Sequence, residues 1–257
     1  MIERTEPGDL PRIAADGRTS LCHYARRGDA PCERACLAVV VLGLAREPSA
    51  WALDLPPVVG LAFSTYAEGL PDWQARVRAA GHEVLLELPL QPRRFPEADA
   101  GPSVISCIAS AEAQVQTLLE VLATGAGYLA VTAPVGAFAA EPARFAPIAQ
   151  TLHARGLGFV EFGAGTLRET AGETALPYEN ALAPDGDEAA SDRTFAAEAE
   201  ALGIGRALLT VPPTPAALER LGAWLGTLPG KGITLVAPST LLDGAASSTR
   251  ISEAQAP

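Results

Sequence analysis

The chain has 257 residues, a length at which alternating strand and helix segments commonly form one barrel-shaped domain, so we expect a single domain. Hydrophobic residues make up 48% of the chain but aromatic residues only 5%, which predicts a large core built mainly from Ala, Leu and Val. The 19 basic and 30 acidic residues give a formal net charge of -11, which repels a phosphate backbone and argues against a nucleic-acid partner.

The first segment, residues 1–36, is rich in charge, Gly and Pro and shows neither helical nor strand periodicity. We therefore expect an irregular extension on the main domain. Met1–Ala15 has neither a basic start nor an apolar core, and no apolar run in the chain approaches the roughly 18 residues that span a bilayer. The sequence as given predicts neither an export signal nor a membrane span.

Three of the four cysteines lie in this segment, at Cys22, Cys32 and Cys36, and Cys107 lies further along the chain. With His23 the first three form only a weak zinc pattern, because no second Cys/His pair stands at ligand spacing. A disulfide among the three is expected in an oxidising compartment, and free thiols are expected in a reducing one. Cys107 is predicted to be a small buried apolar residue.

From Leu37 onward, short apolar runs alternate with longer segments whose apolar residues stand three and four positions apart. The alternation predicts an α/β fold with a parallel sheet, open or closed into a barrel, and any site at the carboxyl ends of the strands. The last stretch, Asp243–Pro257, is Ala- and Ser-rich and is predicted to be a disordered tail. The predicted strands are Leu37–Leu42, Val58–Phe63, Glu83–Leu88, Tyr128–Thr132, Leu157–Phe162, Ala207–Val211 and Ile233–Ala237, with Leu176–Asn180 as a weaker eighth. The predicted helices include Leu70–Ala80, Ala111–Ala123, Ala143–Arg155, Asp192–Leu202 and Pro215–Thr227.

Motifs for common cofactor sites and nucleophiles are incomplete or missing. Gly163-Ala-Gly165 follows a predicted strand but lacks the third glycine of a dinucleotide-binding turn. No phosphate-binding loop, G-x-S-x-G elbow or H-E-x-x-H helix occurs, and the three histidines, His23, His82 and His153, lie far apart. Neither P-loop nucleotide hydrolysis nor a histidine-built metal site is expected.

Two carboxylates, Glu87 and Glu161, stand near the carboxyl ends of otherwise apolar strands. If both faced one cleft they would form a pair suited to acid and base catalysis, as in glycoside hydrolysis. The alternative interpretation is exposure at the rim or pairing with an arginine such as Arg93, Arg94 or Arg168. The candidate cleft residues are Glu87, Glu161, Thr132 and Ser64.

Five segments of the chain carry recognisable sequence motifs: Leu37–Leu44, Leu55–Pro57 with Leu61–Ala67, Ala80–Pro89, Asp99–Pro102 and Gly232–Pro238. In this order they resemble successive blocks of the divergent polysaccharide deacetylase family, over about Leu10 to Leu242, with Gly81–Pro92 the most specific block. The resemblance implies a distorted (β/α) barrel of about seven parallel strands, related to NodB-type carbohydrate esterases. It also implies export to the bacterial periplasm and an association with cell-wall hydrolase systems.

The resemblance further implies an active site in which a divalent metal such as zinc, held by an aspartate and histidines, works with an aspartate base and a histidine acid. At the matching positions of this chain, Glu87 replaces a histidine and Glu161 an aspartate. The remaining positions carry side chains that neither bind metal nor transfer protons. These degenerate positions are Val40 and Val41, for the paired aspartates, and Pro134 and Val211, for two histidines.

These replacements predict a non-catalytic relative without a cofactor, whose inherited cleft binds a glycan, a peptidoglycan fragment or a cell-wall partner protein. Two alternatives remain open: a residual hydrolase that uses Glu87 and Glu161, and a scaffold without any ligand. The resemblance favours a periplasmic or envelope-associated location. A cytoplasmic location is the alternative, because no export signal is found.

Overall fold

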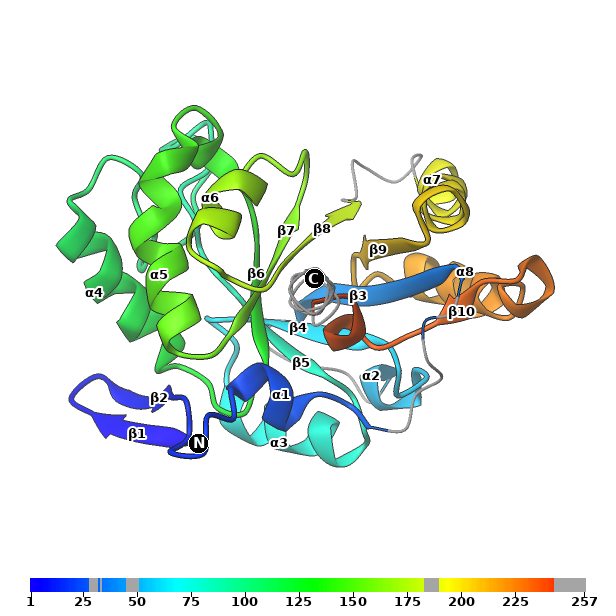
Figure 1. Ribbon diagram of the computed structural model, residues 1–257, viewed down its shortest axis with the longest axis horizontal. Coiled ribbons are helices and arrows are strands. Elements are labelled where there is room, and N and C mark those ends of the chain that lie inside the picture. The colour runs from blue at the N-terminus through cyan, green and yellow to red at the C-terminus, as the bar shows by residue number, and fades with distance from the viewer. Residues whose placement is uncertain (28–31, 33, 45–50, 183–189, 243–257) are drawn as a thin grey trace, which may run out of the picture.

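The computed structural model describes residues 1–27, 32, 34–44, 51–182 and 190–242. Its centre is a closed barrel of seven parallel strands, in which each strand pairs with the next and β9 pairs back with β3 (Figure 1). The predicted (β/α) barrel is confirmed. The strands of the wall are β3 (Cys36–Leu44), β4 (Gly60–Ser64), β5 (Val84–Glu87), β6 (Ala130–Pro134), β7 (Gly158–Phe162), β8 (Tyr178–Leu182) and β9 (Arg206–Val211).

Helices lie outside the barrel wall and link its strands (Figure 1). Two of the longer ones begin at side-chain caps: Ser110 accepts a hydrogen bond from the backbone N–H of Ala113, and Thr214 from that of Ala217. The helices are α2 (Trp51–Asp54), α3 (Leu70–Ala79), α4 (Ala111–Leu122), α5 (Ala146–Ala154), α6 (Arg168–Glu173), α7 (Ala190–Ile204) and α8 (Pro215–Leu225). Short 3-10 helices span Gly136–Ala139 (η1), Pro142–Phe145 (η2) and Pro229–Lys231 (η3).

Two apolar cores lie on the two sides of the barrel wall. Along β3, Ala38 and Val40 belong to the smaller cluster and Val39 and Val41 to the larger one, as expected where successive side chains alternate between faces. The larger cluster also contains residues of the surrounding helices, so it lies outside the wall. The smaller cluster contains residues from strands around the whole barrel and therefore fills its interior.

Three predicted elements differ from the structure in extent. Leu176–Asn180, the weakest predicted strand, corresponds to β8 and completes the wall. Ile233–Ala237 contains only the two-residue strand β10 (Thr234–Leu235), which pairs with the start of β3. The predicted helix Ala143–Arg155 is divided into η2 and α5, because Pro147 near the start of α5 has no backbone N–H to continue a helix through that point.

The N-terminal extension is more regular than predicted. It contains an antiparallel pair, β1 (Ile2–Thr5) and β2 (Gly8–Pro11), followed by the short helix α1 (Ser20–Tyr24). Four-residue strands are too short to show a period in the sequence, which explains why the pattern did not reveal them. Arg155, at the end of α5, forms an ion pair with Glu3 and so holds the pair of strands against the barrel helices.

A disulfide joins Cys32 to Cys36, at the start of β3, while Cys22 is an exposed free thiol. Cys107, predicted as a small buried apolar residue, is only partly buried, and it packs against the outer core. In the described part of the chain, no helix is both long enough and apolar enough to cross a membrane. The predicted disordered tail lies outside the described residues.

Candidate functional site

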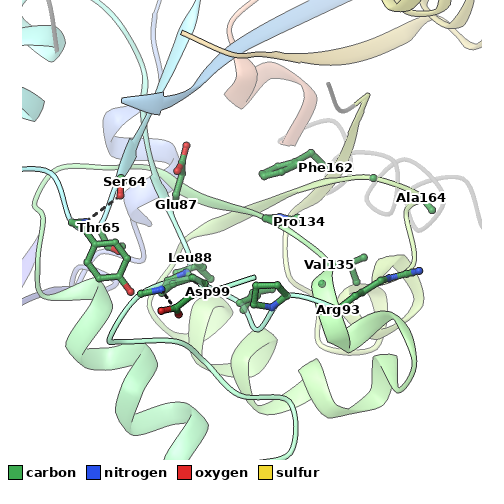
Figure 2. Close-up of a pocket in the computed structure, with 18 residues that line it drawn as sticks. Ser64, Thr65, Glu87, Leu88, Arg93, Asp99, Pro134, Val135, Phe162 and Ala164 are labelled. Carbon is green, nitrogen blue, oxygen red and sulfur yellow. Dashed lines mark hydrogen bonds between the residues drawn. The ribbon is translucent and has the colours of Figure 1, made fainter. Parts of the chain in front are cut away.

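A cleft of about 840 Å³ opens at the carboxyl ends of β4 to β7, the end of a parallel barrel where ligands bind (Figure 2). Strand ends and the loops that follow them form its walls. Aromatic and apolar side chains alternate there with a small number of polar groups, the usual composition of a small-molecule site. The lining residues discussed below are Ser64, Tyr66, Glu87, Arg93, Asp99 and Phe162.

Glu87 is the carboxyl group that strand geometry directs into the barrel mouth. It ends β5, two positions after Leu85 of the interior core, so its side chain lies on the interior face of the wall. Its Oε1 accepts a hydrogen bond from the backbone N–H of Gly43 at the end of β3. Burial raises the pKa of Glu87 to about 7, and the hydrogen bond from Gly43 opposes this rise only in part.

Two loops form the wall beside β4. The Oγ of Ser64 accepts a hydrogen bond from the N–H of Tyr66 at 3.2 Å, and the Tyr66 hydroxyl accepts one from the N–H of Ser103 at 3.2 Å. Asp99 Oδ1 accepts from the N–H of Gly101 at 2.9 Å. Gly101 has a φ of +94°, and a Cβ there would lie 2.6 Å from the Tyr66 ring, so only glycine permits this close contact.

Glu161 lies on the opposite side of the barrel wall from Glu87. Its side chain is completely buried and two positions from Phe159 of the outer core. Its Oε1 accepts a hydrogen bond from the N–H of Thr166 at 2.8 Å, and its Oε2 accepts from the N–H of Leu167 at 2.9 Å and the hydroxyl of Tyr178 at 2.8 Å. Burial, and then the hydrogen bond to Glu161, raise the pKa of Tyr178.

The predicted pair of working carboxylates therefore does not converge on one cleft. Glu87 lines the cleft, whereas Glu161 fixes the loop that follows β7 from behind the wall. Arg168, one of the three arginines suggested as a partner for either carboxylate, instead lies over the Tyr178 ring and 3.8 Å from Glu179. Because acid and base must reach the same substrate atom or its two sides, this separation contradicts the two-carboxylate hydrolase.

The other two candidate cleft residues, Ser64 and Thr132, lie in different surroundings. Ser64 lines the cleft, but Thr132 is completely buried, and its hydroxyl donates a hydrogen bond to the carbonyl of Val160 at 2.8 Å. Thr132 is thus a wall residue below the cleft. Sequence reasoning missed Tyr66, Asp99 and Phe162, which lie at or after strand ends. Asp99 stood in one of the family-like segments, but a loop residue shows no period that would place it in a site.

The four positions that the resemblance matches to family metal ligands and proton carriers hold apolar side chains in different surroundings: Val40 belongs to the interior core, Val41 and Val211 to the outer core, and Pro134 lines the cleft. Val40 and Val41 are completely buried, Val211 is nearly so, and Pro134 is exposed in the cleft. Val211 pairs with Val41 across β9 and β3, so the apolar positions of these two strands are neighbours. None of these side chains can bind a metal or carry a proton.

The residues of the cleft do not fit a zinc centre of the kind that the resemblance implies. Within the described part of the chain, no three His, Cys, Asp or Glu side chains are grouped so that they could hold a metal ion. His82 lies at the amino end of β5, buried, with its Nδ1 2.9 Å from the carbonyl oxygen of Val59. Asp99, the second carboxylate of the cleft, is exposed in a loop. We therefore derive no metal-dependent step.

Barrel and cleft together define a parallel (β/α)-barrel protein with a ligand-sized site at the carboxyl ends of its strands. A family model of divergent polysaccharide deacetylases matches residues 39–242, and the chain belongs to this family. The expected resemblance is thereby confirmed.

A comparison with solved structures finds a relative with the same fold. An uncharacterized protein, ATU2773 from Agrobacterium tumefaciens C58, is 28% identical with a TM-score of 0.83, covering 91% of this chain and 99% of that one. An HpcH/HpaI aldolase from Desulfitobacterium hafniense DCB-2 is 13% identical with a TM-score of 0.35, covering 76% of this chain and 93% of that one, too distant to support any argument. No curated protein matches the chain.

Proposed function

We propose that this protein is a non-catalytic member of its family that binds a glycan of the bacterial cell envelope in the cleft at the barrel mouth. The observation that carries the proposal is the cleft itself, which is open and has a volume of about 840 Å³. The expectation that valine and proline stand at the family's metal-ligand, base and acid positions comes from the sequence resemblance and agrees with it. A site that has kept its volume but lacks catalytic groups is suited to binding without turnover.

The chemistry of the lining supports a sugar as the ligand. Tyr66 and Phe162 offer aromatic surface, on which the C–H faces of sugar rings stack. Ser64, Arg93 and Asp99 supply hydrogen-bonding groups beside that surface. A scaffold without a ligand is less well supported, because large apolar side chains would then be expected to fill the barrel mouth.

A location in the envelope is part of the proposal. The Cys32–Cys36 disulfide supports it, because disulfides persist in oxidising compartments such as the periplasm and are rare in the cytoplasm. Membership of the divergent polysaccharide deacetylase family supports a cell-wall glycan over other small molecules. A cell-wall protein partner is the alternative occupant.

The test is a titration of the purified protein with the tetramer of β-1,4-linked N-acetylglucosamine and with the corresponding glucosamine tetramer, followed by NMR and calorimetry. We expect at least one of them to bind saturably, with shifts centred on the cleft. Tyr66→Ala or Phe162→Ala should weaken that binding about tenfold, since stacked aromatic contacts contribute roughly 1 kcal/mol or more. Trp73→Ala, outside the cleft on α3, is the matched aromatic control. No binding of either sugar, or equal loss with Trp73→Ala, would contradict the proposal.

A further inference from the structure

Glu87 is a carboxylate without a cationic partner in the described part of the chain. Its Oε1 accepts a hydrogen bond from the neutral backbone N–H of Gly43, and among the described residues no Arg, Lys or His forms an ion pair with it. The one lysine of the chain, Lys231, pairs with Glu198 far along the sequence. A partly buried carboxylate without a counter-charge is costly, unless a ligand supplies one.

The neighbouring groups do not neutralise Glu87. Among the described residues that line the cleft, Glu87 and Asp99 are carboxylates and Arg93 is the one arginine. In Figure 2 the Arg93 side chain extends away from the Glu87 carboxyl, at the other end of the cleft. In the strands beside it, Ser64 and Thr132 stand next to Glu87 in register, and neither carries a charge. The cleft is therefore acidic where the carboxyl stands.

An aromatic ring lines the same cleft as the carboxyl. Phe162, from the end of β7, lies on the same side of the cleft as Glu87 (Figure 2). A ring face and a carboxylate are the two features that attract an ammonium group, the first through its quadrupole and the second through charge. A neutral acetamide gains neither, and an anionic sugar is repelled.

We propose that the cleft selects glycans carrying a free amino group, with Glu87 receiving the ammonium of a glucosamine unit. This inference rests on the proposed function, because it names the ligand class of the same cleft. The protein would then recognise sugars whose amino group has been freed by deacetylation. Its preference would be the opposite of that of an enzyme that acts on the N-acetyl form. The hydrogen bond from Gly43 leaves Oε2 to receive the ammonium.

Calorimetry with the two tetramers tests the proposal directly. At neutral pH the glucosamine tetramer should bind at least about tenfold more tightly than the N-acetylglucosamine tetramer, because hydrogen bonds to charged groups contribute about 1.5–3 kcal/mol. Glu87→Gln keeps the shape and the acceptor for Gly43 and should remove that preference. Glu219→Gln on the exposed surface of α8, outside the cleft, changes the net charge equally and should leave the preference intact.

The pH dependence gives a second readout. Lowering the pH from neutral can only increase the protonated fraction of the ligand's amino groups, so a fall in affinity for the glucosamine tetramer must come from protonation of the protein. With the pKa of Glu87 at about 7, the affinity should fall more than tenfold between pH 7 and pH 5.5. The other charged groups among the described lining residues, Arg93 and Asp99, are unchanged in Glu87→Gln, so this substitution should flatten the profile.

The possible results separate the two proposals. Equal binding of both tetramers would overturn the amino-group preference and leave glycan binding standing. A preference for the glucosamine tetramer that survives in Glu87→Gln, or disappears equally in Glu219→Gln, would also overturn it, because general attraction to an acidic protein would then explain the result. Failure of both tetramers to bind would remove the proposed function and this inference together.

Discussion

The ionised carboxyl of Glu87 places a negative charge in the cleft and lowers the stability of the folded protein. Its carboxyl ionises near 4.5 in the unfolded chain but near 7 in the folded one, because burial disfavours the charged form. Between these values the folded state retains a proton that the unfolded state has released. Stability therefore falls as the pH rises through this window, and the full cost is present above pH 7.

The substitution Glu87→Gln is expected to stabilise the protein at alkaline pH. At about pH 8 the free energy of unfolding should rise by on the order of 3 kcal/mol, and near pH 4 the gain should vanish, because both states of the wild type are then protonated. Urea unfolding of the two proteins at several pH values measures the difference. A gain that does not depend on pH would show that the charge of Glu87 is not the cause.

Glu161 is expected to behave as a structural residue. Glu161→Ala leaves the Tyr178 hydroxyl and the N–H groups of Thr166 and Leu167 without their buried acceptor, which should cost about 2–4 kcal/mol of stability. Tetramer affinity, measured below the unfolding transition, should change less than about threefold, since the side chain does not line the cleft. Loss of binding in a folded Glu161→Ala variant would contradict this assignment.

At the scale of elements, the segment that follows β6 forms part of one cleft wall. Gly136, the first residue of η1, has a φ of +55°, and a Cβ there would lie 2.3 Å from the carbonyl oxygen of Gln91. The neighbouring N–H of Ala137 donates a hydrogen bond to the same oxygen at 2.7 Å. The two loops therefore approach so closely that only glycine is tolerated.

Gly136→Ala should thus disturb the cleft as well as the fold. We expect a loss of about 1–3 kcal/mol in unfolding free energy together with weaker tetramer binding, because the Gln91 loop must move. Gly222→Ala is the matched control: it lies within α8 with open space around it and should stabilise by about 0.5–1 kcal/mol without any change in binding. Urea unfolding and calorimetry compare both variants, and unaltered binding by Gly136→Ala would contradict the role given to this loop.

The sequence predicts the strands far better than it predicts the site. Continuous apolar runs such as Leu37–Leu42 form strands in the structure, because strands covered on both faces need apolar residues at every position. The apolar run before Glu87 places this residue at the end of a strand. Glu161 follows a similar apolar run, yet its side chain lies on the opposite face of the barrel wall. Which face a residue occupies depends on closure of the barrel, which the pattern of a single strand does not encode.

At the scale of the whole molecule, the cysteines link the fold to a compartment. In denaturant without reductant, alkylation should label two thiols, Cys22 and Cys107, and after reduction it should label all four cysteines. Mass spectrometry of protein taken from the periplasm distinguishes the two states. Four free thiols in that sample would contradict the Cys32–Cys36 disulfide and weaken the proposed location.

The most direct test of the account is acetate release from the N-acetylglucosamine tetramer with zinc, cobalt or magnesium present, by wild type and by Glu87→Ala. The account predicts no release above the protein-free blank with any metal, because the resemblance matches Val40, Val41, Pro134 and Val211 to the family positions that would supply metal ligands and proton carriers. Metal-stimulated release by the wild type that Glu87→Ala abolishes would contradict it, and the protein would then be an enzyme that works through this single carboxylate.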